Sequence, residues 1–155
     1  MDSDFYILAL DLSLSNTGCC IFDGKGIPLE LVSIPTNSKD THGQRLKIIA
    51  DKLLEIRSKY NISIVVLEKG FTRFNTSTQT IFKVHGIANY IFYDCEQIYY
   101  APSTIKKIVC GKGNADKDEV KTIIKLIFPS LDFKNNDESD AASIGYAYFL
   151  DNGVL

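Results

Sequence analysis

Hydrophobic positions near the N-terminus follow the pattern of three short strands joined by polar turns. Residues 5–10 form an apolar run that ends at Asp11, residues 17–22 form a second run, and residues 28–34 alternate between apolar and polar side chains. Polar segments at 12–16 and 23–26 separate the three. Short apolar runs divided by turn residues predict an antiparallel three-stranded meander.

The pattern then changes to a helical period at 41–60, where apolar residues recur on one face: Leu46, Ile49, Leu53 and Ile56. Residues 62–67 are a continuous apolar run that ends at Glu68, which is typical of a buried strand. Beyond it we expect a helix at about 78–92, a strand at 97–101, a brief helix at 103–109 capped by Ser103, and helices at 116–128 and 137–150. This order predicts an α/β fold with a five-stranded mixed sheet, three antiparallel strands followed by parallel ones, flanked by helices on both faces.

Length and composition fit one globular domain spanning residues 1–155. The chain is 45% hydrophobic and 23% charged, and it shows no repeat and no linker. No apolar run approaches the roughly 18 residues that a membrane span requires. The first residues lack the basic and apolar segments of a signal peptide, so we expect a cytoplasmic protein with no membrane partner.

The cysteines point to packing rather than chemistry. Four are present, none forms a C-x-x-C pair, and only two histidines accompany them, which argues against a structural zinc site. Cys19 and Cys20 are adjacent in a predicted strand, so their side chains should enter opposite faces of the sheet.

A net charge of −2 hides basic and acidic regions. Residues 69–89 carry three basic side chains and no acid, and residues 103–125 carry six lysines against three acids. Residues 126–155 carry one lysine against five acids. Most of these charges fit solvated helix faces, and the whole-chain basic charge of many nucleic-acid binders is absent.

Four carboxylates stand where a metal site would need them. Asp11 and Glu68 each end a predicted buried strand, while Asp137 and Asp140 share one face at the start of a predicted helix. Sites in open α/β sheets form beyond the carboxyl ends of the strands. Hard oxygen ligands favour Mg²⁺ or Mn²⁺, and two such ions can clamp a phosphodiester. Each acid alone also fits a turn or a helix N-terminus.

The order of these motifs resembles that of the RuvC-type Holliday junction resolvases, within the ribonuclease H-like superfamily. Four segments carry the resemblance: 9–18 (ALDLSLSNTG), 66–71 (VLEKGF), 101–117 with its lysines and the GKGNADK run, and 137–142 (DESDAA). The first segment lacks the glycine and proline usual in bacterial members. This departure suggests a divergent branch closer to phage and viral members, in which case the cytoplasm would be that of a host.

The resemblance implies a ribonuclease H-like fold and an endonuclease that resolves branched DNA into ligatable nicks with 5′ phosphates. Two Mg²⁺ ions, replaceable by Mn²⁺, would be bound with no small-molecule cofactor by Asp11, Glu68, Asp137 and Asp140. Two lysines match those near the scissile phosphate of the family, where an ammonium suits the charge of the transition state: Lys106 and Lys117. Without the motif, both lysines are ordinary helix-surface charges.

The resemblance also implies DNA contacts after the second acidic motif. Phe71 would be a wedge that stacks on a base at the junction centre, or else packs against the next helix. Lys69, Arg73 and Lys83 would hold the phosphate backbone. Asn75 is either a further DNA contact or a turn residue.

The family forms a two-fold homodimer, which suits the symmetry of a four-way junction. The helix predicted at 78–92 carries apolar residues that fit such an interface: Ile81, Ile87, Tyr90, Ile91 and Phe92. A fully buried helix would show the same pattern.

Three other interpretations stay open. A nuclease of this fold acting on flaps, forks or RNA–DNA hybrids would keep the same carboxylates. A junction-binding protein that does not cleave would have no use for them, and buried acids carry a cost in stability. Actin-like ATPases and sugar kinases share the strand-ending Asp11 and the Thr17-Gly18 pair, but they need a second domain.

Overall fold

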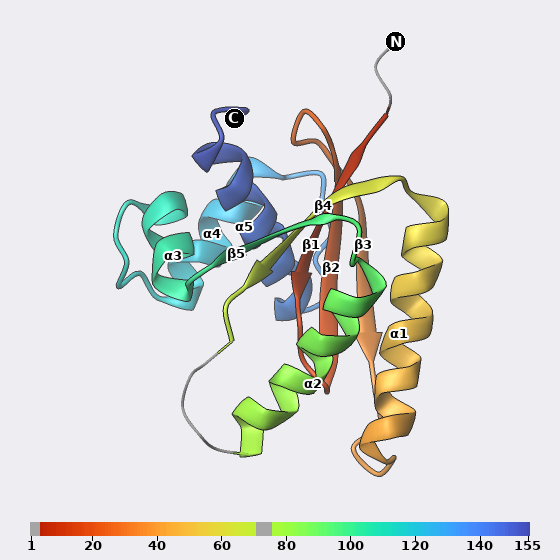
Figure 1. Ribbon diagram of the computed structural model, residues 1–155. Coiled ribbons are helices and arrows are strands. Elements are labelled where there is room, and N and C mark those ends of the chain that lie inside the picture. The colour runs from red at the N-terminus through yellow and green to blue at the C-terminus, as the bar shows by residue number, and fades with distance from the viewer. Residues whose placement is uncertain (1–3, 71–75) are drawn as a thin grey trace.

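A five-stranded sheet forms the centre of the computed structural model, which describes residues 4–70 and 76–155 (Figure 1). The strands are β1 (Tyr6–Asp11), β2 (Asn16–Asp23), β3 (Pro28–Pro35), β4 (Ile62–Glu68) and β5 (Glu96–Tyr100). Their order across the sheet is β3-β2-β1-β4-β5. The first three strands pair antiparallel, and β4 and β5 continue the sheet in parallel with β1. The predicted mixed sheet is confirmed.

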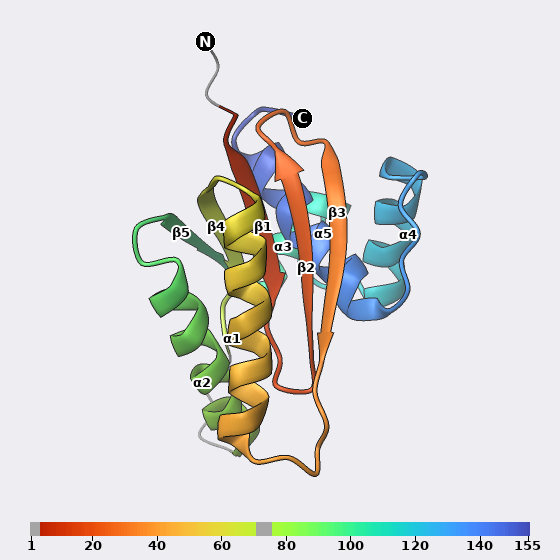
Figure 2. The ribbon, with the colours of Figure 1, turned by 90° about the vertical axis from the view of Figure 1, so that its right-hand side faces the viewer.

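Helices cover both faces of this sheet. They are α1 (His42–Lys59), α2 (Thr76–Ile91), α3 (Pro102–Cys110), α4 (Lys117–Ile127) and α5 (Asn136–Asp151). Figure 2 shows α1 and α2 on one side of the sheet, with α5 and the shorter helices on the other. No helix in the described part of the chain is long and apolar enough to cross a membrane.

Each face of the sheet closes a separate hydrophobic core. The core under α1 and α2 takes Leu8 from β1, and the core under α5 takes its neighbour Ala9, because side chains alternate along a strand. Cys19 and Cys20 are fully buried in different cores, as predicted. Both thiols therefore act as packing groups.

Most helices begin at residues that cap them. Thr41 forms a capping box with Gln44 before α1, and Asp116 forms one with Glu119 before α4. The prediction that Ser103 caps α3 is wrong, because that helix begins one residue earlier at Pro102, with no side-chain cap. Proline suits the first position of a helix, since its fixed φ is helical and no N–H is needed there.

Two of the five apolar residues that fit an interface are buried within this chain. Ile91 and Phe92 are buried in the core of this chain, with 7% and 0% of their surface exposed. Tyr90 and Tyr93, by contrast, are 78% and 77% exposed. Packing on the sheet therefore uses part of the apolar surface of this segment and leaves the two tyrosines outside.

Candidate metal-dependent active site

Asp11 and Glu68 end two neighbouring parallel strands. Leu10 of β1 pairs with Leu67 of β4, so the acids that follow lie beside each other at the carboxyl edge of the sheet. The strand-ending positions predicted for both residues are those the structure shows.

Gly18 allows α5 to reach this edge. It pairs with Asp11 across β1 and β2, and a Cβ on Gly18 would lie 2.1 Å from the backbone oxygen of Asp137. Further along α5, a Cβ on Gly145 would lie 2.2 Å from the ring of Phe22. These two close approaches seat α5 on β2, and they place Asp137 next to Asp11.

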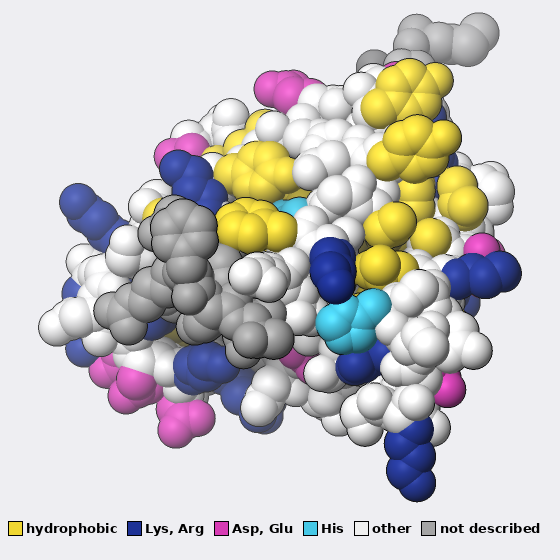
Figure 3. Space-filling view, turned by 60° about the horizontal axis from the view of Figure 1, so that its bottom comes forward, with side chains coloured by type: hydrophobic (Ala, Val, Ile, Leu, Met, Phe, Trp, Pro, Cys, Tyr) yellow, Lys and Arg dark blue, Asp and Glu magenta, His cyan; other side chains and the backbone are white. Residues whose placement is uncertain are grey.

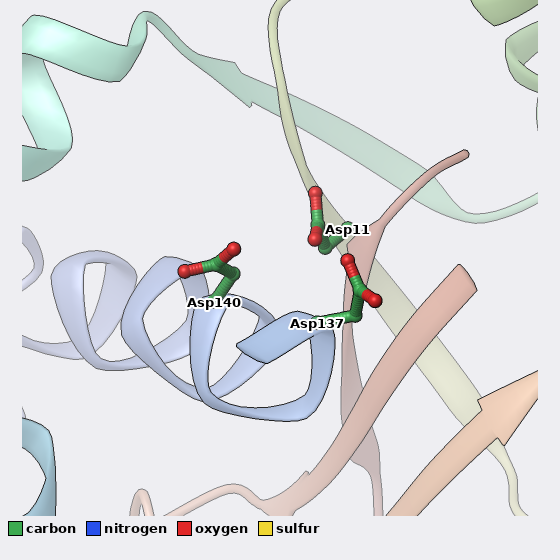
Figure 4. Close-up of side chains that lie close together, drawn as sticks. All are labelled: Asp11, Asp137 and Asp140. Carbon is green, nitrogen blue, oxygen red and sulfur yellow. The ribbon is translucent and has the colours of Figure 1, made fainter. Parts of the chain in front are cut away.

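Three aspartates form a cluster at this position (Figure 4). One carboxylate oxygen of each lies within 4.8 Å of the others: Asp11, Asp137 and Asp140. Figure 4 shows Asp11 coming from β1 and the other two from the first turns of α5. The cavity they line is also lined by Glu68, Ser13, Lys106 and Lys117. The structure thus brings together the four predicted carboxylates and the two predicted lysines.

Burial and mutual repulsion raise the pKa values in this cavity. The pKa of Asp11 rises to about 8, first because of burial and then because of the neighbouring charges of Asp140, Glu68 and Asp137. Burial also raises the pKa of Glu68, which Lys117 and Lys106 partly offset, and that of Asp140. An acid whose pKa is raised in this way, as that of Asp11 is, can give up its proton when a cation binds beside it.

The groups present fit a hard divalent cation. Carboxylate oxygens are the preferred protein ligands of Mg²⁺, and three of them converge here, with Glu68 in the same cavity. The side-chain amide of Asn16 donates from Nδ2 to Oδ2 of Asp137 over 2.8 Å. Its own Oδ1 is buried and lacks a partner within the described residues. The acceptors gathered around the three aspartates suit a cation, while the ammonium groups of Lys106 and Lys117 line the same cavity.

Only part of the predicted DNA surface can be located. Lys69 follows Glu68 and is exposed, and Lys83 is exposed on α2 with its Nζ 2.9 Å from Nδ1 of His42. Phe71, Arg73 and Asn75 lie outside the described residues. Figure 3 shows basic side chains and a histidine spread over the face of the molecule at this end of the sheet.

Sequence reasoning assigned no role to Ser13, Asn16 or Gly18 at the site. All three belong to the segment between Asp11 and the body of β2, which was noted only as a motif. Asn16 and Gly18 are two residues apart, which puts them on one side of the strand. This spacing is the feature of the sequence that indicates a shared neighbour. Their role at the site depends on how α5 packs over them, and that packing cannot be read from the local sequence.

The sheet order and the flanking helices define a class, the α/β proteins of ribonuclease H-like fold, and the aspartate cluster lies at the carboxyl edge of that sheet. Residues 7–147 match the family described as crossover junction endodeoxyribonuclease RuvC. The chain belongs to this family.

Individual relatives agree with this assignment. Proteins named crossover junction endodeoxyribonuclease RuvC from Rickettsia massiliae (strain Mtu5) and Rickettsia bellii (strain OSU 85-389) are each 31% identical over 149 residues, which cover 90% of this chain and 94% of theirs. The fold resembles T. thermophilus RuvC in complex with Holliday junction substrate, with a TM-score of 0.84, 19% identity and coverage of 95% and 94%. The fowlpox virus Holliday junction resolvase matches with a TM-score of 0.58, 15% identity and coverage of 97% and 99%.

Proposed function

We propose that this chain is a Holliday junction-resolving endonuclease, a single nuclease domain over residues 1–155 that acts in the cytoplasm. The observation that carries the proposal is the cluster of Asp11, Asp137 and Asp140 within 4.8 Å, in a cavity also lined by two lysines. The names of the relatives support hydrolysis of DNA, and the junction named with the T. thermophilus and fowlpox proteins supports branched DNA as the substrate.

The proposed cofactor is Mg²⁺, two ions per site, for which Mn²⁺ should substitute. When bound, the ions supply positive charge to the phosphate and lower the pKa of water. Asp11, Glu68, Asp137 and Asp140 would hold them. The chain itself keeps these carboxylates close despite their repulsion, because β1, β4 and α5 are fixed by the two hydrophobic cores.

Two lysines would face the phosphate group that is cut. Lys106 is half-buried on α3 and Lys117 is the first residue of α4, and both line the cavity of the aspartates. Their ammonium groups would stabilise negative charge that grows on the phosphoryl oxygens. Outside the cavity, the DNA backbone would contact Lys69, Lys83 and Arg73, with Phe71 as a wedge and Asn75 as a further contact.

We further propose that the enzyme works as a two-fold homodimer. A hollow between α1 and α2 is lined by apolar side chains, including Leu54, Ile87, Tyr90 and Tyr93. Leu54 is 50% exposed and the tyrosines more so, and such surface marks contact sites between proteins. Figure 3 shows hydrophobic side chains gathered to one side of the basic face. Two sites related by a two-fold axis could nick a four-way junction symmetrically.

Cleavage of a labelled four-way junction tests the proposal. The purified chain, with Mg²⁺, is given the junction, a linear duplex of the same sequence and a flapped duplex. Symmetric, ligatable nicks confined to the junction and absent from Asp140→Asn are expected. Equal cutting of the flap would indicate a broader nuclease, and tight junction binding with no cutting in Mg²⁺ or Mn²⁺ would contradict the catalytic proposal.

A further inference from the structure

Asn16 makes a contact with the acidic cluster that the family assignment does not explain. It begins β2, and its Nδ2 lies 2.8 Å from Oδ2 of Asp137, across 121 positions of sequence. The orientation of the amide follows from chemistry, because an ionised carboxylate only accepts hydrogen bonds and the Asn16 nitrogen only donates them. The contact therefore joins a fixed donor on the sheet to the first turn of α5.

This donor is unusual in its surroundings. Among the described residues, no other nitrogen donates a hydrogen bond to a carboxylate of Asp11, Asp137 or Asp140. A carboxylate with one oxygen held cannot turn freely about its last bond, so its second oxygen is presented in one direction. In Figure 4, one oxygen of Asp137 is turned toward Asp11 and the other away from it.

The far side of the amide supplies a second, independent observation. Oδ1 of Asn16 is buried and has no hydrogen-bond partner within the described residues. Buried acceptors are normally satisfied, and the part of the chain that the structure describes supplies no donor to this oxygen. The neighbouring carboxylates offer none when ionised, whereas the water shell of a divalent cation carries donors.

We propose that Asn16 is a positioning residue, which orients the carboxylate of Asp137 and thereby sets the affinity of the site for divalent cations. The inference rests on the proposed metal-binding role of the aspartates. Partners that orient metal ligands typically change metal affinity by about 10–100-fold when they are removed. Asn16 does not touch the DNA phosphate in this assignment, so its loss should leave junction binding unchanged.

Direct titration with Mn²⁺, followed by the electron paramagnetic resonance signal of the free ion, measures this affinity without catalysis. Asn16→Ala should weaken Mn²⁺ binding by about tenfold and raise the Mg²⁺ concentration for half-maximal junction cleavage by the same factor. Junction affinity in EDTA should stay within about twofold of wild type, because Asn16 makes no DNA contact in this assignment and no metal is bound under that condition. Asn61→Ala is the matched control, because Asn61 is exposed and makes one 3.4 Å contact with Asp4.

A variant with a longer amide side chain distinguishes the orienting role of Asn16 from its contribution to packing. Asn16→Gln keeps the donor on a longer arm, so its Mn²⁺ affinity should exceed that of Asn16→Ala, with both variants folded by circular dichroism. The reverse order, or an Asn16→Ala affinity equal to that of Asn61→Ala, would overturn the role of Asn16. If wild type binds Mn²⁺ and Asn16→Ala weakens that binding as expected, but wild type cuts no junction, the proposed function fails and the positioning role stands.

Discussion

The carboxylate of Glu138 accepts a hydrogen bond from Oγ of Ser33 over 3.1 Å, and this contact ties α5 to the edge strand β3. Glu138 is 2% exposed, and its other oxygen accepts from the backbone N–H of Lys134. Asn135 completes the network by donating to Ser33 and accepting from the backbone of Glu138. The network fixes the first turn of α5, from which Asp137 and Asp140 extend.

Removing this carboxylate should destabilise the fold. Glu138→Ala removes the buried carboxylate that accepts from the Ser33 hydroxyl and the Lys134 N–H in two part-buried hydrogen bonds, and the loss should cost about 1–3 kcal/mol. Urea unfolding should show a matching loss of free energy. Glu55→Ala is the control, since Glu55 is exposed in a surface ion pair with Lys52 and should change stability by less than about 0.5 kcal/mol. Equal effects of the two substitutions would contradict the structural role of Glu138.

Filling the space at Gly18 should separate the aspartates. The Cβ of Gly18→Ala would overlap the Asp137 backbone, so α5 has to shift away from β2. We expect junction cleavage to fall by about 100-fold or more, because small misplacements of reacting groups carry costs of this size. Gly43→Ala is the control, since the nearest atom to its Cβ is 4.0 Å away. Wild-type cleavage by Gly18→Ala would show that the close approach is not needed.

Stability without metal should fall as the pH rises. The folded pKa of Asp11 is about 8, while an unfolded aspartate titrates near 3.9. Between these values the folded chain keeps a proton that the unfolded chain has released, so the free energy of unfolding decreases with increasing pH. In EDTA, Tm should drop from pH 5 to pH 9, and Asp11→Asn should show a shallower drop. Mg²⁺ at pH 8 should raise Tm, because it binds only the folded state. An identical slope in the variant would exclude Asp11 as the cause.

The cavity lysines should affect rate more than binding. Lys117→Ala removes an ammonium that faces Glu68 and Asp140, and loss of one such group typically costs about 100-fold in kcat. Junction affinity measured with Ca²⁺ in place of Mg²⁺ should change much less, since many other groups contact the backbone. Lys112→Ala is matched in charge but pairs with Glu119 on the surface. A rate loss shared by both variants would point to a general effect of charge.

Charges placed in the hollow between α1 and α2 should separate the proposed dimer. Tyr90→Glu with Leu54→Glu would bury carboxylates in an apolar contact, and we expect the dissociation constant to rise by about 30-fold or more. Light scattering after gel filtration measures the oligomeric state. Leu126→Glu is the control, because Leu126 is 75% exposed on α4, away from the hollow. A wild-type chain that is monomeric with and without junction DNA would contradict the dimer.

The local pattern of apolar residues was enough to predict the strands and helices, because side chains repeat every two residues along a strand and about every 3.6 along a helix. The runs that end at Asp11 and Glu68 are strands, and parallel pairing of β1 with β4 then places both acids at one edge. The helical spacing of Asp137 and Asp140 likewise needs only local geometry. These features made the four-carboxylate hypothesis possible before the fold was known.

The remaining features depend on contacts between distant segments. The 2.8 Å contact of Asn16 with Asp137 and the approach of α5 to Gly18 arise only when the last helix packs on the second strand. Composition alone does not show which apolar residues of the helix predicted at 78–92 face the sheet. Ile91 and Phe92 fit either an interface or a buried helix, and the structure buries both in the core of this chain. The expected cap at Ser103 is wrong, because α3 already begins at Pro102 and Ser103 lies within the helix.

The burial of α5 has a consequence for how the site can fluctuate. Side chains around nearly the whole of this helix are buried, from Glu138 to Phe149, so it cannot detach without exposing the core. Amide hydrogens of such a helix exchange with solvent only when the entire fold opens. Asp137 and Asp140 therefore extend from a helix that is held by the core, and the geometry of metal binding should persist until global unfolding.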